Sequence, residues 1–124
     1  MYVNLWKETN QVLETHGLTW DDVKMVWIEK EDLLGRKEPE RFKLPKARFE
    51  ELAKDTEYDN GFGGAEVCEG LHIRGYNKVG TPFVMFRNEY DGSEWWELHF
   101  LYTDLPIGDV ANLSNSPDYF EEDE

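Results

Sequence analysis

Residues 81–102 constrain the fold most, because they have the pattern of two strands joined by a tight turn. Both halves of this stretch are rich in aromatic and β-branched residues, as strands are. Asp91 and Gly92 lie between them, and this dipeptide favours a type I′ turn, which needs positive φ at both central residues. We therefore predict a β-hairpin and expect the rest of the chain to cover one of its faces.

Alternation assigns the side chains of the second strand to two faces. The set expected to face the core is Trp96, Leu98, Phe100 and Tyr102. The opposite set is Trp95, Glu97, His99 and Leu101. Trp95 therefore either packs under a helix or loop, or is an exposed aromatic anchor for a partner.

The remaining elements predict an α+β fold. We expect a helix over residues 4–16, a short turn and a strand up to residue 30, a long polar connection over 31–44, a second helix opened by Pro45 that ends near Asp55, and a strand within 67–75. The four strands should form a mainly antiparallel sheet with both helices on one face. The expected core includes Trp27, Phe49, Leu52, Leu71, Ile73, Trp96, Leu98 and Phe100.

Length and cysteine content bound the organisation. The chain has 124 residues, so we expect one domain over residues 1–104 and an acidic irregular extension over 105–124. A lone cysteine, Cys68, excludes an internal disulfide and fits a reducing cytoplasm, and we expect it to be a small buried side chain. No run approaches the roughly 18 apolar residues of a membrane span. The first residues lack the pattern of a signal peptide, so we expect a cytoplasmic protein.

Charge is distributed unevenly along the chain. Residues 1–87 hold 16 acidic and 13 basic residues, whereas residues 88–124 hold 11 acidic residues and no Lys or Arg. We expect the hairpin turn, the second strand and the C-terminal extension to form one acidic region. Such a region repels nucleic acid and anionic membranes, so we expect no direct contact with either and instead a basic protein surface as the partner.

Basic residues concentrate within residues 36–48. They are Arg36, Lys37, Arg41, Lys43, Lys46 and Arg48. This cluster is either a solvated surface or a docking patch, with the protein's own acidic extension as one candidate occupant.

Two patterns bear on metal chemistry. The acidic residues Asp55, Glu57, Asp59 and Glu66 have calcium-loop spacing, but position 6 is Asn60 and a strand follows, so we expect a flexible loop. His72 and His99, with a nearby carboxylate, could hold zinc or iron if the strands brought them together. We expect them to be two surface histidines, and we assign no catalytic residue, metal or cofactor.

Two segments carry a resemblance to known proteins. They are Gly70-Leu-His-Ile-Arg-Gly75 and Arg87-Asn-Glu-Tyr-Asp-Gly-Ser-Glu-Trp-Trp-Glu97. Through these two segments, residues 65–97 resemble a stretch of small uncharacterised phage and prophage proteins of Gram-positive bacteria. The resemblance implies a setting but no activity.

The first functional hypothesis is a non-enzymatic acidic protein-binding module. In a phage setting it would inhibit a host enzyme by occupying a basic, nucleic-acid-binding surface. The residues expected to contact the partner are Glu89, Asp91, Glu94, Trp95, Glu97, Tyr119, Phe120, Glu121 and Glu122. The alternatives are a small metal-dependent or hydrolytic enzyme that uses His72 and His99, and a structural component whose outward Trp95 and Leu101 form a homo-oligomer interface.

Overall fold

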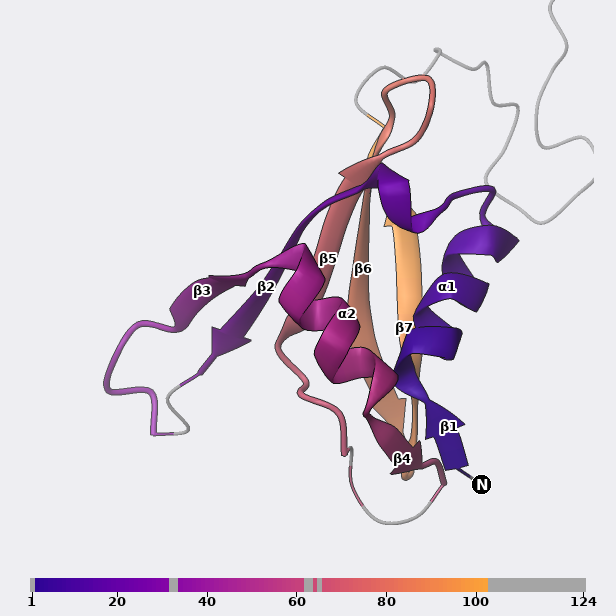
Figure 1. Ribbon diagram of the computed structural model, residues 1–124. Helices are drawn as coiled ribbons and strands as arrows, with labels where there is room; N and C mark the ends of the chain where they lie inside the picture. Colours follow the sequence, from indigo (N-terminus) through magenta and orange to yellow (C-terminus); the bar gives the residue numbers. More distant parts are fainter. Residues whose placement is uncertain (1, 32–33, 62–63, 65, 103–124) are drawn as a thin grey trace, which may run out of the picture.

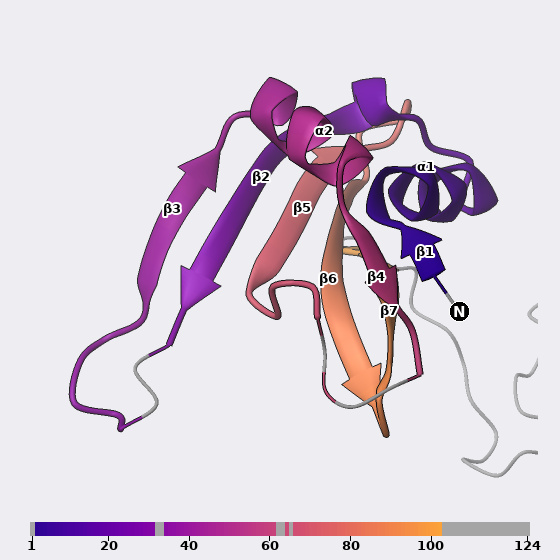
Figure 2. The same ribbon diagram turned by 60° about the horizontal axis from the view of Figure 1, so that its bottom comes forward.

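A five-stranded antiparallel sheet with two helices on one face makes up most of the described structure (Figures 1 and 2). The structure is a computed structural model that describes residues 2–31, 34–61, 64 and 66–102. Its elements are β1 (Tyr2–Asn4), α1 (Leu5–Thr15), a 3-10 turn (Trp20–Asp22), β2 (Val23–Lys30), β3 (Glu40–Leu44), α2 (Lys46–Lys54), β4 (Glu57–Asp59), β5 (Leu71–Tyr76), β6 (Pro82–Tyr90) and β7 (Ser93–Phe100). The large sheet has the order β3-β2-β5-β6-β7, and β1 pairs with β4 in a separate two-stranded sheet. The predicted α+β class is confirmed.

The predicted hairpin is formed by β6 and β7. Its register runs from Phe83 opposite Phe100 to Tyr90 opposite Ser93. Asp91 and Gly92 have φ values of 50° and 84°, as a type I′ turn requires. The turn chemistry therefore fixes which face of β7 points toward the helices, because a slip of one residue would exchange the two faces.

The core lies between the helices and the sheet. Strand alternation directs Val26, Ile73, Met85 and Trp96 inward, where all four are buried. The helices supply the buried side chains Leu5, Thr9, Leu13, Phe49 and Ala53. The Trp96 indole N–H donates a hydrogen bond to Thr9 Oγ1 at 2.9 Å, which ties β7 to α1. Of the predicted core, Leu98 and Phe100 are partly buried against this cluster.

Glycine at position 75 allows the chain before β2 to approach β5 closely. A Cβ atom at Gly75 would lie 2.0 Å from the backbone oxygen of Asp22 and 2.9 Å from the Phe83 ring. The register between β2 and β5 shifts at this point, between Val23 and Met25. The shift leaves Val26 on the core face and Trp27 on the opposite face.

Several predictions about single elements are wrong. Residues 40–44 do not belong to a connection but form β3, which pairs with β2 from Val26 to Lys30. Leu52 is 42% exposed, because α2 packs mainly through Phe49 and Ala53, one turn apart on the same helix face. Trp27 lies on the face of the sheet away from the helices and is half-buried.

Positions at the ends of strands also differ from the expectation. Tyr102, expected to face the core, lies beyond the end of β7 and is exposed. Cys68 is exposed rather than buried, because its neighbour Val67 occupies the inward position in the loop before β5.

No helix in the described ranges is long and apolar enough to cross a membrane. The expected boundary at residues 104–105 lies outside the described residues, as do Tyr119, Phe120, Glu121 and Glu122.

Candidate functional site

The β6–β7 turn meets the loop that connects β4 to β5. The Gly61 N–H donates to the Gly92 carbonyl at 3.0 Å, and the Glu94 N–H donates to Asn60 Oδ1 at 2.8 Å. Figure 1 shows β4 and the β6–β7 turn at the same end of the sheet. Two segments that are distant in the sequence therefore form one end of the molecule.

Carboxylates gather at this end, which we call the acidic end and define by the residues Glu57, Asp59, Glu66, Glu69, Glu89 and Asp91. All are exposed except Asp59, which is half-buried. Glu69 and Glu89 line the same hollow of about 250 Å³. Neither residues 55–73 nor residues 88–102 contain a Lys or Arg. The described structure thus adds carboxylates from β4 and the β4–β5 loop to the negative charge that the sequence predicts at the hairpin turn.

The four residues contributed by β4 and the β4–β5 loop were not predicted to contact a partner, although the sequence held a signal for them. No Lys or Arg occurs between Lys54 and Arg74. In addition, the Glu-Tyr-Asp triplet at residues 57–59 recurs at residues 89–91, and the structure places these two triplets at the same end. The stretch without Lys or Arg therefore indicated an acidic surface at the place where the spacing of the acidic residues suggested a calcium loop. Among the described residues, no group of three His, Cys, Asp or Glu side chains could hold a metal ion.

A buried ion-pair network lies beneath the acidic end. The Arg87 guanidinium, whose side chain is 3% exposed, donates to Glu8 Oε1 and to Glu94 Oε1, both at 2.9 Å. It also stacks near the rings of Tyr58 and Trp96, at 5.3 and 5.1 Å from their centroids. The one Arg of the hairpin is therefore committed to internal carboxylates, and it does not neutralise the exposed ones.

Glu94 requires a correction, because it was expected to contact a partner. Its side chain is 2% exposed and accepts hydrogen bonds from the backbone N–H groups of Glu66 and Val67 as well as from Arg87. Glu94 therefore holds the β4–β5 loop against the hairpin. Its contribution to partner binding is indirect, through the position of the acidic end.

Tyr58 provides a pH test of this network. Its hydroxyl donates to Glu8 Oε1 at 2.8 Å, and burial, with a smaller contribution from Glu8, raises the pKa of Tyr58 from 10.0 to about 12. Because the folded state holds this proton more tightly, its contribution to stability is complete below the unfolded pKa of 10.0 and is lost as the pH rises through about 12. We expect Tyr58→Phe to flatten the fall in the free energy of unfolding between about pH 9 and about pH 12.

The measurement is urea unfolding over this pH range, with Tyr76→Phe as the control because Tyr76 is exposed. The control should retain the slope of the natural protein. An identical pH dependence for Tyr58→Phe and the natural protein would contradict the assignment.

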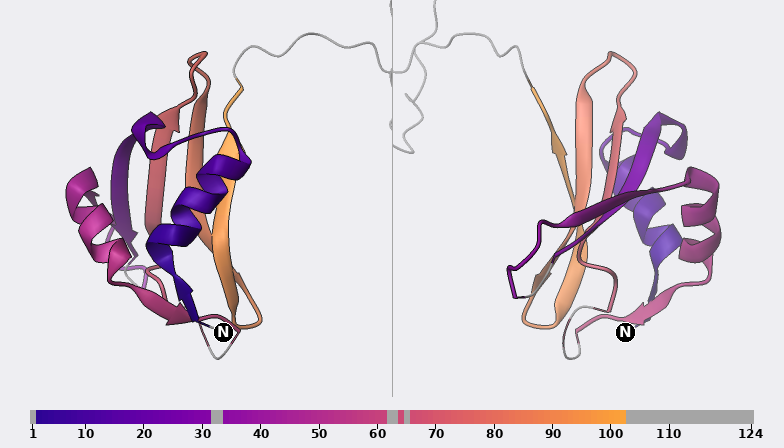
Figure 3. Two further views of the ribbon diagram at one scale, coloured as in Figure 1. Left: turned by 45° about the vertical axis from the view of Figure 1, so that its right-hand side comes forward. Right: turned by 90° about the vertical axis from the view of Figure 1, so that its left-hand side faces the viewer.

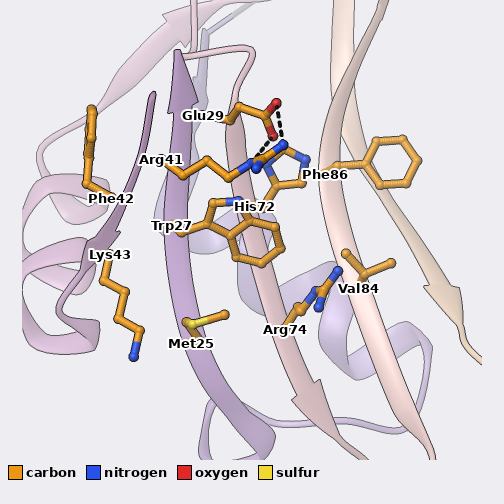
Figure 4. A pocket seen from close by; sticks show the side chains of 10 residues that line it. All are labelled: Met25, Trp27, Glu29, Arg41, Phe42, Lys43, His72, Arg74, Val84 and Phe86. Carbon is orange, nitrogen blue, oxygen red and sulfur yellow. Dashed lines mark hydrogen bonds and ion pairs between the residues drawn. The ribbon is translucent and has the colours of Figure 1, made fainter. Parts of the chain in front are cut away.

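The second candidate surface is the face of the sheet that the helices leave uncovered, which we call the open face (Figure 3). Trp27, His72 and Phe86 are neighbours across β2, β5 and β6. The Trp27 and His72 rings are stacked, with 4.6 Å between their centroids and 10° between their planes. The Arg74 guanidinium lies 4.9 Å from the Trp27 ring centroid. Figure 4 shows these side chains lining a hollow of about 650 Å³. The open face therefore combines planar rings with cations.

The open face extends onto β7. Glu97 pairs across the sheet with Phe86, and Trp95 pairs with Asn88. The His99 ring stacks on the Phe86 ring, with 5.6 Å between their centroids. His99 Nε2 lies 3.3 Å from Glu97 Oε2. This hydrogen bond is the main reason that the pKa of Glu97 lies below its ordinary value. Trp95 and Glu97 are thus on a different surface from Glu89 and Asp91, although all four lie close together in the sequence.

The two histidines do not form a joint site in the described structure. His72 lies on β5 and His99 on β7, with β6 between them. Each histidine stacks on a different aromatic ring, and His72 Nδ1–H donates to the Gly70 carbonyl at 2.8 Å. Both side chains act as parts of the open face.

The predicted basic cluster is divided between surfaces. Lys46 donates to the carbonyls of Trp20 and Val23, and Arg48 pairs with Glu51. Only two members, Arg41 and Lys43 on β3, line the hollow of the open face.

No known protein-family model, no curated protein and no solved structure matches this chain.

Proposed function

We propose that this protein is a non-enzymatic binding module whose acidic end engages a basic surface of a partner protein. The observation that carries the proposal is the gathering of six carboxylates from two distant segments, which contain no Lys or Arg. A concentrated charge of one sign steers an oppositely charged partner into contact and makes association sensitive to salt.

The sequence resemblance to phage proteins supports a more specific form of this proposal. In that setting the partner is a nucleic-acid enzyme of the host, and the acidic end competes with nucleic acid for a channel lined with Lys and Arg. Arg87 supports this role from below, because its bond to Glu94 holds the β4–β5 loop beside the hairpin turn. Glu57, Glu69, Glu89 and Asp91 are exposed at this end and can meet the partner's cations.

An affinity experiment in extract of the native cell tests the proposal. The bait is the full chain, compared with a variant in which Glu57, Glu69 and Glu89 are changed to Gln and Asp91 to Asn. We expect the natural protein to retain a basic partner that high salt releases, and the neutralised variant to lose it.

The matched control neutralises four exposed acids away from the acidic end, namely Glu14, Asp21, Glu38 and Glu40. Because it removes the same formal charge, it should still retain the partner. Equal retention by all three proteins in both salt washes would contradict the proposal, and loss from both variants would show that total charge alone is responsible.

A further inference from the structure

The open face carries cations that have no carboxylate partner in the described part of the chain. Arg74 is exposed and contacts the Trp27 ring, and Lys43 is exposed on β3. Around them, Met25, Val84 and Phe86 present half-buried apolar surface. A hollow of this kind suits a segment that offers both apolar side chains and carboxylates, because cations beside rings bind carboxylates while the rings cover apolar groups.

The chain itself contains a segment with this chemistry. Residues 103–124, here called the C-terminal segment, hold seven acidic residues and no basic residue. Its larger apolar and aromatic side chains are Leu105, Ile107, Val110, Leu113, Tyr119 and Phe120. The acidic, aromatic sequence at residues 118–122 complements a face with aromatic rings and free cations.

The C-terminal segment is long enough to reach the open face from the point where the described chain ends. Leu101 and Tyr102 follow β7, and β7 is separated from β2 by two strands, which corresponds to about 15 Å between strand axes. The chain from Tyr102 to Tyr119 can span up to about 55 Å. The length of chain therefore allows Tyr119 and Phe120 to reach Trp27.

We propose that the C-terminal segment docks on the open face of its own sheet, with Tyr119 and Phe120 against the Trp27–Phe86 hollow and the neighbouring carboxylates toward Arg74 and Lys43. This contact is distinct from the acidic end. It covers the rings with a segment of the same chain and places the segment's negative charge on the face that holds unpaired cations.

Paramagnetic broadening in the full chain tests the contact. A nitroxide is attached to Asn115→Cys in a Cys68→Ser background, which removes the exposed native thiol. We expect the indole N–H signal of Trp27 to be broadened and that of Trp20, which packs against α2, to be retained. A nitroxide at Glu51→Cys on α2 is the control and should broaden Trp20 in preference to Trp27.

Substitutions and mixing distinguish the proposed occupant from others. Changing Tyr119 and Phe120 together to Ser, or Arg74 to Ala, should restore the Trp27 signal, and added salt should weaken the broadening. An unbroadened Trp27 signal in the chain labelled at Asn115→Cys, with Tyr119, Phe120 and Arg74 unchanged, would overturn the proposal. So would broadening that appears only between spin-labelled and isotope-labelled copies, because the occupant would then be a second molecule.

Discussion

Replacing Arg87 with Met is expected to lower the free energy of unfolding by about 3–5 kcal/mol. The substitution keeps much of the apolar volume between the Tyr58 and Trp96 rings but removes the charge that balances Glu94. Glu94 would remain a carboxylate with a side chain only 2% exposed, without its charged partner. A loss of this size is a large fraction of the 5–15 kcal/mol typical of a small domain.

Urea unfolding monitored by tryptophan fluorescence measures the effect as a fall in the midpoint at constant slope. The matched control is Arg41→Met, which breaks the ion pair with Glu29 at 3.3 Å on a side chain that is 65% exposed. We expect this control to cost less than about 1 kcal/mol. A similar small cost for Arg87→Met would mean that the buried network does not hold the hairpin and the β4–β5 loop together.

The second large effect concerns partner association. Changing Glu57, Glu69 and Glu89 to Gln and Asp91 to Asn is expected to slow association with the basic partner by about 10- to 1000-fold at low ionic strength. The amides preserve the size of the side chains, so shape is retained while long-range attraction is lost. Stopped-flow mixing with the partner recovered from extract provides the rate constants, and an unchanged constant would contradict steering by the acidic end.

The sequence predicted the elements whose local chemistry and packing agree. Asp91-Gly92 has one favoured turn, and the alternation of Trp96, Leu98 and Phe100 specifies the inner face of β7. The helices were also predicted, because their apolar positions have helical spacing. Strand β3 was missed because residues 40–44 are mostly charged, and its pairing with β2 is a tertiary contact without a local apolar pattern.

The candidate surfaces were predicted only in part, because they too depend on tertiary contacts that leave no local pattern in the sequence. Glu89 and Glu94 are opposite each other on the same face of the hairpin, so alternation does not separate them. Glu94 is buried because Arg87 and the backbone of Glu66 and Val67 bind it, whereas Glu89 is exposed. Trp27 was expected in the core because large aromatic residues are usually buried, whereas the register shift near Val23 leaves it on the open face. The described part of the expected acidic region also divides, because Glu97 on β7 lies on the open face whereas Glu89 and Asp91 lie at the acidic end, and the extension over 105–124 lies outside the described residues.

The most direct test of the proposed function is the association rate constant of the natural protein and its recovered partner, measured over a series of salt concentrations. If the acidic end steers the partner, the rate constant should fall steeply as the Debye length shortens from about 30 Å at 0.01 M to about 8 Å at 0.15 M. The dissociation rate constant should change much less. A rate constant for association that is independent of salt would contradict the central claim that charge at the acidic end drives recognition.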